Sequence, residues 1–335
     1  MALGTWDGLR QGRTERPRQN ADVYAPTRMR VRMTTTSKSS TPTQEPSSGQ
    51  DRLAADTSMG AVSLRAADLD AMTAYYRDAV TLSVLTQDGE RSVLGRQQTP
   101  IVILEHAPEL RHASARQAGL FHTAILFETE RDLAAAVYSV AARHPRSFTG
   151  SADHLVSKAF YFDDPEGNGV ELYWDRDRTQ WSWTHGLVEM ASLQLDPKTF
   201  LQQNHPQLDA TSAAPAPASV GHVHLSVGDV TTARQFYADQ LGFEVTNHFG
   251  PQALFVSAGG YHHHMAMNTW NSAGAGRRQL TLGLGLVRID VPTADDLGAL
   301  GQRLGYSRVP TQDDGRILGF DDPWSNRIEV AVKTG

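Results

Sequence analysis

The amino-acid sequence predicts an α+β protein with four βαβββ modules, whose strands form cupped, mostly antiparallel sheets behind a disordered N-terminal extension. Two observations lead to this prediction. An internal repeat divides the chain into two similar halves, and each half switches twice between the alternating pattern of strands and the spacing of helices. The extension is residues 1–58, which are rich in Arg, Ser, Thr and Pro and show almost no hydrophobic periodicity.

The repeat is carried by two segments of each half. Asp68 and the pair Tyr75–Tyr76 recur at the same spacing as Asp229 and the pair Phe236–Tyr237. Asp-Asp-Pro followed by Asn and Glu occurs at 163–171 and again at 321–329. We therefore expect two domains of two modules each, 59–175 and 220–333. The residues between them, 176–219, include a stretch of Pro, Ala and Ser that is typical of a linker.

The order of elements is clearest in the second module. Residues 122–127 alternate as a strand, 130–142 form an Ala-rich helix, and 159–162 and 170–174 read as short strands. The first module repeats this order, with a strand at 61–64, a helix at 68–76 and strands near 84 and 101–104. The Asp-Pro-Glu-Gly-Asn stretch between the last two strands of the second module predicts a tight turn, because Pro and Gly adopt the required backbone angles.

Composition excludes several kinds of function. The 335 residues carry 31 Lys and Arg against 37 Asp and Glu, so no basic excess is present to bind nucleic acid. Cysteine is absent, which excludes disulfides, thiolate metal sites and Cys nucleophiles, and leaves 13 His and the carboxylates to hold any metal. No apolar run reaches the roughly 18 residues that cross a bilayer. The extension lacks the apolar core of a secretory signal, so we expect a cytoplasmic protein, with Met33 a plausible start.

The strand at Gly221–Val227 and the helix from Asp229 through Phe236–Tyr237 resemble the vicinal oxygen chelate superfamily. The resemblance covers nearly all of 59–333. In that family paired βαβββ modules curl into a cup whose concave face holds a metal. The family includes isomerases, dioxygenases, hydrolases and binding proteins, so the fold by itself does not choose among these functions.

Alternation along the strands predicts which side chains face this cup. Those expected to pack against the helices are Phe121, Thr123, Ile125, Phe127, Val170, Leu172, Trp174, Val223, Leu225 and Val227. His122, His222, His224 and Glu171 then face inward. His122, His222 and Glu171 lie on first and last strands, where the family holds its metal, and two His with one carboxylate form the triad favoured by non-haem Fe(II). The alternative is that such histidines are surface or hydrogen-bonded residues of strands.

A more specific signature lies in the second module. His154, Phe160–Tyr161, Asp164–Pro165, Gly167 and Glu171 have the spacing of the extradiol ring-cleavage dioxygenase signature, and Ala152 is its one departure. The resemblance implies that His154 and Tyr161 lie beside the iron, where they bind and deprotonate a catechol, and that Glu171 is a ligand. The alternative is that Tyr161 packs in a core and His154 lies on a loop.

A third cluster is Tyr261–Asn268, with three consecutive histidines. Extradiol enzymes carry a His-His pair on the matching strand, and its second member is the acid–base residue near the oxygen site. A gapless alignment implies His264 for this role. Strand alternation also puts His262 on the same face, so the choice between these two stays open. A polar strand end is the alternative reading, although 265–267 continue as a buried strand.

The modules supply these residues unevenly. The fourth module has Leu286, and the first has Ala61, where a ligand histidine is expected. Modules two and three together supply His122, His222 and Glu171, so we expect them to form the active cup. The competing arrangement pairs modules three and four and uses His222, His264 and Glu329. A separation of more than about 10 Å between His122 and His222 would exclude the first arrangement, since both nitrogens must lie within roughly 2.2 Å of one ion.

The function expected from these residues is an Fe(II)-dependent extradiol dioxygenase acting on catechol or a substituted catechol with O2. Mn, Zn or Ni are the alternative metals. One alternative function is a glyoxalase-type metal-dependent isomerase or lyase with four N/O ligands. Another is a binding protein of the bleomycin-resistance kind, with an apolar cup and no catalysis. The expected partners are a small aromatic diol and O2, with no nucleic acid and no membrane, and self-association into a homo-oligomer is left open.

Overall fold

The computed structural model describes residues 52–205 and 216–333. Residues 1–51 of the predicted disordered extension lie outside these ranges. Residues 52–58 are described: the Leu53 N–H donates to the carbonyl of Gly242 at 2.9 Å, and β1 begins at Ser58. The described residues confirm the α+β class, and each of the four modules has the order of one strand, one helix and three strands. None of the described helices is both long and apolar enough to span a membrane.

The first and second modules follow one another without a break. The first comprises β1 (Ser58–Ala66), α2 (Leu69–Ala74), β2 (Ser83–Gln87), β3 (Arg91–Arg96) and β4 (Thr99–His106). The second comprises β5 (Gly119–Phe127), α3 (Glu130–Arg143), β6 (Phe148–Asp153), β7 (Ser157–Asp163) and β8 (Gly169–Asp175). The predicted helix at 130–142 is therefore confirmed to within one residue.

The connection to the third module has structure of its own. It contains a 3-10 turn (Arg178–Gln180), the short strands β9 (Trp183–Thr184), β10 (Leu187–Val188) and β11 (Leu193–Gln194), and α4 (Pro197–Asn204). The third module comprises β12 (Ala218–Ser226), α5 (Val230–Arg234), β13 (Glu244–Phe249), β14 (Ala253–Ser257) and β15 (Met265–Asn268). The fourth comprises β16 (Gly283–Val291), α6 (Ala294–Tyr306), β17 (Thr311–Asp313), β18 (Ile317–Asp321) and β19 (Arg327–Val332).

The repeated aspartates begin the helices of modules one and three. The Asp68 carboxylate accepts the backbone N–H of Ala71 at 2.9 Å, and Asp229 accepts that of Thr232 at 2.6 Å. Each side chain thereby satisfies a donor that the first turn of a helix leaves free. Both helices end in a π-helical turn, at Tyr75–Ala79 and Gln235–Gln240, which contains the repeated aromatic pair.

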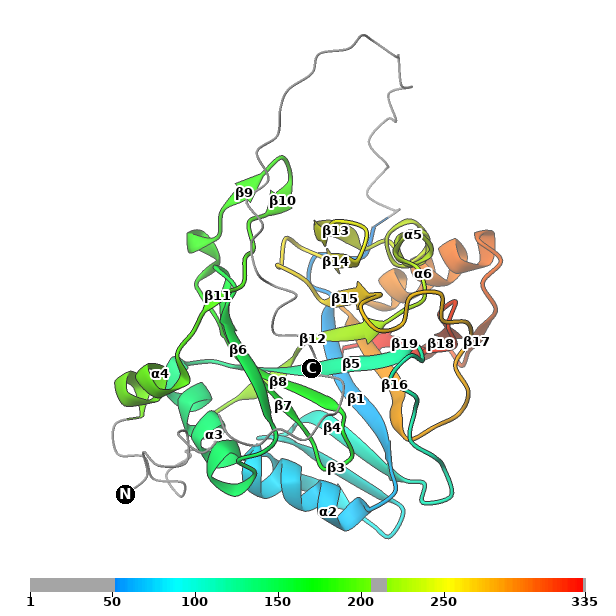
Figure 1. Cartoon of the computed structure of the whole chain (residues 1–335). Helices are drawn as coiled ribbons and strands as arrows, with labels where there is room; N and C mark the ends of the chain where they lie inside the picture. Colours follow the sequence, from blue (N-terminus) through cyan, green and yellow to red (C-terminus); the bar gives the residue numbers. More distant parts are fainter. Residues whose placement is uncertain (1–51, 206–215, 334–335) are drawn as a thin grey trace.

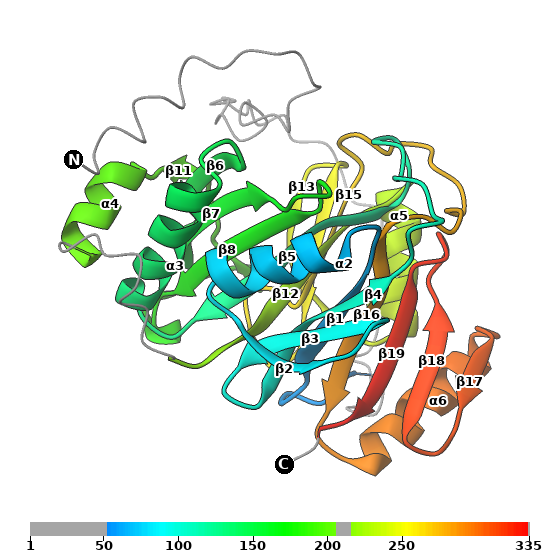
Figure 2. The same cartoon turned by 90° about the horizontal axis from the view of Figure 1, so that it is seen from below.

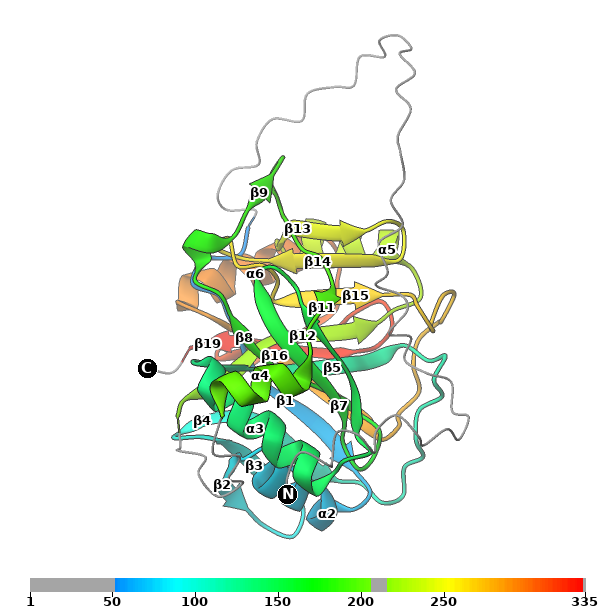
Figure 3. The same cartoon turned by 60° about the vertical axis from the view of Figure 1, so that its left-hand side comes forward.

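The sheets do not follow the order of the chain. Nine strands form one sheet in the order β11-β6-β7-β8-β5-β12-β15-β14-β13, and eight form another in the order β17-β18-β19-β16-β1-β4-β3-β2. Modules two and three meet where β5 pairs antiparallel with β12, and modules one and four meet where β1 pairs with β16 (Figures 1 and 2). Figure 3 shows β13, β14, β15, β12 and β5 side by side.

This topology excludes the arrangement in which modules three and four share a cup. Glu329 lies on β19 of the eight-stranded sheet, where its carboxylate is 3.4 Å from Arg288, whereas His222 lies on β12 of the other sheet. The opening strand of module three, β12, pairs antiparallel with β5 of module two, whereas β16 of module four pairs antiparallel with β1. The division into domains 59–175 and 220–333 stays a prediction.

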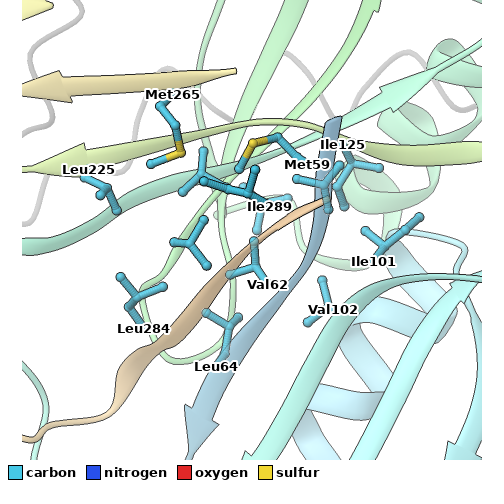
Figure 4. Packing of buried hydrophobic residues seen from close by; sticks show 14 of the residues in the cluster. Met59, Val62, Leu64, Ile101, Val102, Ile125, Leu225, Met265, Leu284 and Ile289 are labelled. Atoms are coloured by element: carbon cyan, nitrogen blue, oxygen red, sulfur yellow. The ribbon is translucent and has the colours of Figure 1, made fainter. Parts of the chain in front are cut away.

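One hydrophobic core holds the two sheets and their helices together. Figure 4 shows Met59, Val62 and Leu64 of β1 together with Ile125 of β5 and Leu225 of β12, all of them buried. Burying each such side chain contributes about 1.5–3 kcal/mol. Because one face of the nine-stranded sheet is used for this core, its other face is left to form a cavity.

A duplicated hydrogen bond links the two modules of each half across the sheets. The hydroxyl of Tyr76 donates to Asp164 in the β7–β8 turn at 3.0 Å, and that of Tyr237 donates to Asp322 in the β18–β19 turn at 3.0 Å. Burial raises the pKa of Asp164 to about 6, against the hydrogen bonds that its carboxylate accepts. The sequence repeat therefore corresponds to a repeated tertiary contact.

Candidate metal centre

His122, Glu171 and His222 converge on the free face of the nine-stranded sheet. Glu171 pairs with Ala124 on β5, and Ala124 pairs with His222 on β12, so these residues form a row across three strands. His122 lies two residues before Ala124 and points to the same face. The small side chain of Ala124 leaves space between its larger neighbours. His122, Glu171 and His222 are each at most 6% exposed as whole residues.

Both imidazoles approach the same carboxylate oxygen. Nε2 of His122 lies 2.9 Å from Oε2 of Glu171, and Nε2 of His222 lies 3.1 Å from it. The three ligand atoms all lie within 4.8 Å of one another. Two ligands at right angles, each about 2.0–2.2 Å from an ion, lie about 2.8–3.1 Å apart. The two measured separations fit this arrangement.

The donor set also fits a metal by its chemistry. Within the described part of the chain, Nε2 of His122 is buried and makes no hydrogen bond, although it lies close to Glu171. Burial lowers the pKa of His222, against the effect of the neighbouring Glu171, which favours its neutral imidazole. Burial alone would raise the pKa of Glu171, but the neighbouring His222 and His122 hold it well below its usual range. Neutral imidazoles and an ionised carboxylate are the forms that bind divalent metals.

Two irregularities in the β5–β12 pairing shape this face. The register shifts between Val220 and His222, and a Cβ at the intervening Gly221 would lie 1.6 Å from the hydroxyl of Tyr173. The register shifts again where His224 pairs with His122 and the next residue pairs with Leu120. Such bulges re-aim side chains next to functional sites.

The predicted direction of the Phe121 side chain is wrong because of the second bulge. Simple alternation assigned this side chain to the helix-packed face, but its ring lies 4.9 Å from that of His224 and 5.2 Å from that of Trp270. Phe121 is the extra residue of the bulge, so alternation does not hold there. Ile125, Phe127 and Leu225 do pack in the hydrophobic core, as predicted.

The triad lies in a cavity of about 290 Å³. One wall comes from the third module, and another comes from residues 190–193 of the connection that the sequence indicated as a linker. Besides the triad, the lining includes His154, Tyr161, His224, Phe249, Phe255, His263 and Trp270. The linker prediction missed this wall because the segment has little regular hydrophobic pattern.

His154 and Tyr161 form a hydrogen-bonded pair at the cavity. Nδ1 of His154 lies 2.9 Å from the carbonyl oxygen of Ala191, and Nε2 lies 2.8 Å from the hydroxyl of Tyr161. A carbonyl can only accept, so Nδ1 carries the proton and Nε2 accepts from Tyr161. Burial lowers the pKa of His154. Tyr161 also pairs directly with Glu171 across β7 and β8.

The structure places His263, rather than His264 or His262, at the cavity. Nδ1 of His264 accepts from the Ser257 hydroxyl at 2.9 Å and from the Ala258 N–H at 3.2 Å, and burial lowers its pKa to about 3. The ring of His263 lies 4.1 Å from that of His222.

Alternation does not hold at the histidine run because residues 261–264 are not regular strand. β15 begins only at Met265, and Gly259 and Gly260 both have positive φ. This glycine pair is a signal in the sequence that could have indicated the irregularity.

His224 faces the cavity, as alternation predicted, and is held by Asn268. The amide oxygen of Asn268 accepts the backbone N–H of Trp270 at 3.1 Å, which directs its amide nitrogen to Nε2 of His224 at 3.0 Å. Nε2 of His224 therefore accepts and its Nδ1 carries the proton. Burial holds the pKa of His224 well below its usual value.

Comparisons with known proteins agree with this fold. The profile of the Glyoxalase/Bleomycin resistance protein/Dioxygenase superfamily matches residues 58–172 and 219–330. A catechol-2,3-dioxygenase of Bacillus subtilis (strain 168) is 32% identical over 270 residues, which cover 78% of this chain and 93% of that protein. The crystal structure of a putative dioxygenase from Bacillus subtilis superposes with a TM-score of 0.56 at 13% identity, covering 85% of this chain and 87% of the other. A mutant glyoxalase I from Zea mays superposes with a TM-score of 0.51 at 14% identity, covering 83% and 92%. The chain belongs to the Glyoxalase/Bleomycin resistance protein/Dioxygenase superfamily.

Proposed function

We propose that the protein is an Fe(II)-dependent extradiol dioxygenase that cleaves catechol or a substituted catechol with O2. The observation that carries the proposal is the convergence of His122, Glu171 and His222 in one cavity with the His154–Tyr161 pair. The similarity to a catechol-2,3-dioxygenase supports the same reaction. The catechol and O2 are thus the proposed substrates.

In this proposal His122, His222 and Glu171 are the metal ligands. Fe(II) held by these residues would supply Lewis-acid and oxygen chemistry. The two imidazoles are neutral ligands and the Glu171 carboxylate carries one negative charge, so one of the two positive charges of the metal would remain. The site therefore favours an anionic form of the diol, which can supply the remaining charge.

Tyr161 and His154 would take the proton that such a substrate loses. The proton of the diol moves to the Tyr161 oxygen while the Tyr161 proton moves 2.8 Å along the existing hydrogen bond to Nε2 of His154. His154 stays oriented because its Nδ1–H donates to the Ala191 carbonyl. General acid–base steps of this kind contribute about 10²–10⁴-fold to rates.

His263 is the proposed acid–base residue on the opposite side of the triad. Its ring lies against His222 and lines the cavity, whereas Tyr161 lies near His122, with ring centroids 5.6 Å apart. The two proton-handling groups therefore flank the triad. This assignment replaces His264, which lines no part of the cavity.

The test starts from metal-free protein loaded anaerobically with Fe(II) and supplied with a panel of catechols in oxygenated buffer. We expect one O2 consumed per catechol, a yellow ring-opened product, and both atoms of ¹⁸O2 in that product. Protein that binds the metal stoichiometrically and consumes no O2 with any catechol would refute the proposal. Oxygen-independent conversion of a thiohemiacetal would instead identify a glyoxalase-type isomerase.

Adjacent histidines provide a matched pair of variants. His263→Gln is expected to lower kcat by about 10²-fold or more, because the acid–base group is lost while the three ligands remain. His264→Gln is expected to keep kcat within a few-fold, since its side chain does not reach the cavity. Metal content is measured in both, so that lost activity is not confused with lost metal.

A further inference from the structure

A carboxylate outside the cavity is held by two buried side chains. Asp175, the last residue of β8, accepts the hydroxyl of Tyr261 on Oδ2 at 2.7 Å and lies 2.9 Å from Nε2 of His262 through Oδ1. The hydroxyl of Tyr261 also lies 2.7 Å from that of Tyr173. The His262 side chain is 1% exposed and that of Asp175 is 16% exposed, so the carboxylate lies nearer the surface than the imidazole that contacts it.

His262 contacts His263, which lines the cavity. Nδ1 of His262 lies 2.8 Å from Nδ1 of His263. The ring of Trp181 lies 5.3 Å from that of His262 and covers it on another side. Asp175, His262 and His263 thus form one hydrogen-bonded chain, of which only His263 lines the cavity.

The partners determine where the protons lie in this chain. An ionised carboxylate only accepts, so Nε2 of His262 carries a proton and donates to Asp175. When Nε2 carries the only proton of His262, its Nδ1 has a lone pair and accepts from Nδ1–H of His263. The remaining nitrogen of His263, Nε2, is therefore unprotonated. A free imidazole has no such constraint on its tautomer.

We propose that Asp175 and His262 are positioning residues that hold His263 in its Nδ1–H tautomer, so that its Nε2 offers a lone pair to the substrate. The acid–base role of His263 rests on the proposed function, whereas the tautomer does not. Hydrolases use a carboxylate–imidazole contact in the same way, to fix the tautomer of a catalytic histidine. Here a second imidazole lies between the two.

The tautomer is measured directly, without turnover. Protein labelled with ¹⁵N-histidine is examined in metal-free form and with Zn²⁺ in the site, using NMR correlations between ring nitrogens and ring protons. The His263 signals are assigned by their loss in His263→Gln. The expected wild-type spectrum has a protonated Nδ1 and an unprotonated Nε2 for His263. A protonated Nε2 on neutral His263 overturns the proposal.

Two variants of His262 separate positioning from packing. His262→Phe keeps a ring but removes both nitrogens, so His263 is expected to populate the Nε2–H tautomer and kcat to fall about 10- to 100-fold. The metal content and KM are expected to stay near wild-type values. His262→Gln can still accept from His263 and donate to Asp175, so it is expected to recover the Nδ1–H tautomer and most of kcat.

These experiments distinguish a failure of the positioning role of His262 from a failure of the proposed dioxygenase function. A His263 tautomer that does not change in His262→Phe contradicts the positioning role, whatever the activity. Wild-type protein with the expected tautomer and no O2 consumption with catechols refutes the dioxygenase assignment alone. If His262→Phe does not fold, the wild-type spectrum and His262→Gln still decide the result.

Discussion

The hydroxyl of Tyr173 occupies the place where a side chain at position 221 would lie. A Cβ on Gly221 would be 1.6 Å from that oxygen and 2.7 Å from the ring carbon that bears it. Gly221 is needed here for close approach, next to the proposed ligand His222. The same hydroxyl is hydrogen-bonded to Tyr261, so this contact connects the ligand strand to the side chains around Asp175.

Gly221→Ala is expected to destabilise the protein and weaken the metal site together. The added methyl must displace Tyr173 or β12, and such overpacking costs about 1–3 kcal/mol. Urea unfolding and titration with Zn²⁺ measure the two effects. Gly150→Ala is the control on the same sheet, since a Cβ there meets nothing within 4 Å. Equal stability of the two variants would contradict the close contact.

Glu171→Gln is expected to abolish stoichiometric metal binding, because it removes the only anionic ligand of the proposed triad. Calorimetric titration with Zn²⁺ or anaerobic Fe(II) tests this. The matched control is Glu329→Gln, which changes the corresponding repeat position in the fourth module on the other sheet. Loss of binding in the control and not in Glu171→Gln would place the metal in the eight-stranded sheet.

The pH dependence of stability is expected to include a contribution from Asp164. Burial raises its folded-state pKa to about 6, above the value of 3.8 for an unperturbed carboxyl. The folded state therefore holds this proton to higher pH, so the contribution to stability is complete below about pH 4. It is lost as the pH rises through about 6.

Asp164→Asn is expected to remove this pH-dependent contribution to the free energy of unfolding, which is about 3 kcal/mol at most. The measurement is urea unfolding of metal-free protein between pH 4.5 and 7, expressed as a difference from wild type. Asp196→Asn should leave the slope in this pH range unchanged, because hydrogen bonds from Thr199 lower the pKa of Asp196 and its carboxylate is ionised there in both the folded and the unfolded state. An equal change of slope in both variants would contradict the assignment to Asp164.

Tyr76→Phe and Tyr237→Phe are expected to cost similar amounts of stability. Each removes one hydrogen bond to a buried carboxyl group, worth about 1–3 kcal/mol. The losses should add in the double variant, because the two contacts share no residue. Denaturant midpoints with unchanged m-values measure this. A loss confined to one variant would show that the two contacts are not equivalent.

Much of the fold could be predicted from the sequence because its signals are local. The capping aspartates, the alternating strands and the turn residues each depend on near neighbours in the chain. Alternation along the strands also placed His122, Glu171 and His222 on one face, where the structure brings them together, and their role as metal ligands stays a proposal. Alternation did not hold at Phe121 and at the histidine run, where a bulge and a glycine pair interrupt it.

The sequence by itself determined the α+β class, the four modules and the superfamily to which they belong, since these follow from short-range pattern and repeat. Tertiary structure alone decided that a wall of the cavity comes from the connection, that His263 rather than His264 reaches it, and that His262 links it to Asp175. The wall and the link to Asp175 depend on contacts between segments far apart in the chain, which have no local sequence signature, whereas the irregular histidine run is indicated locally only by its preceding glycine pair.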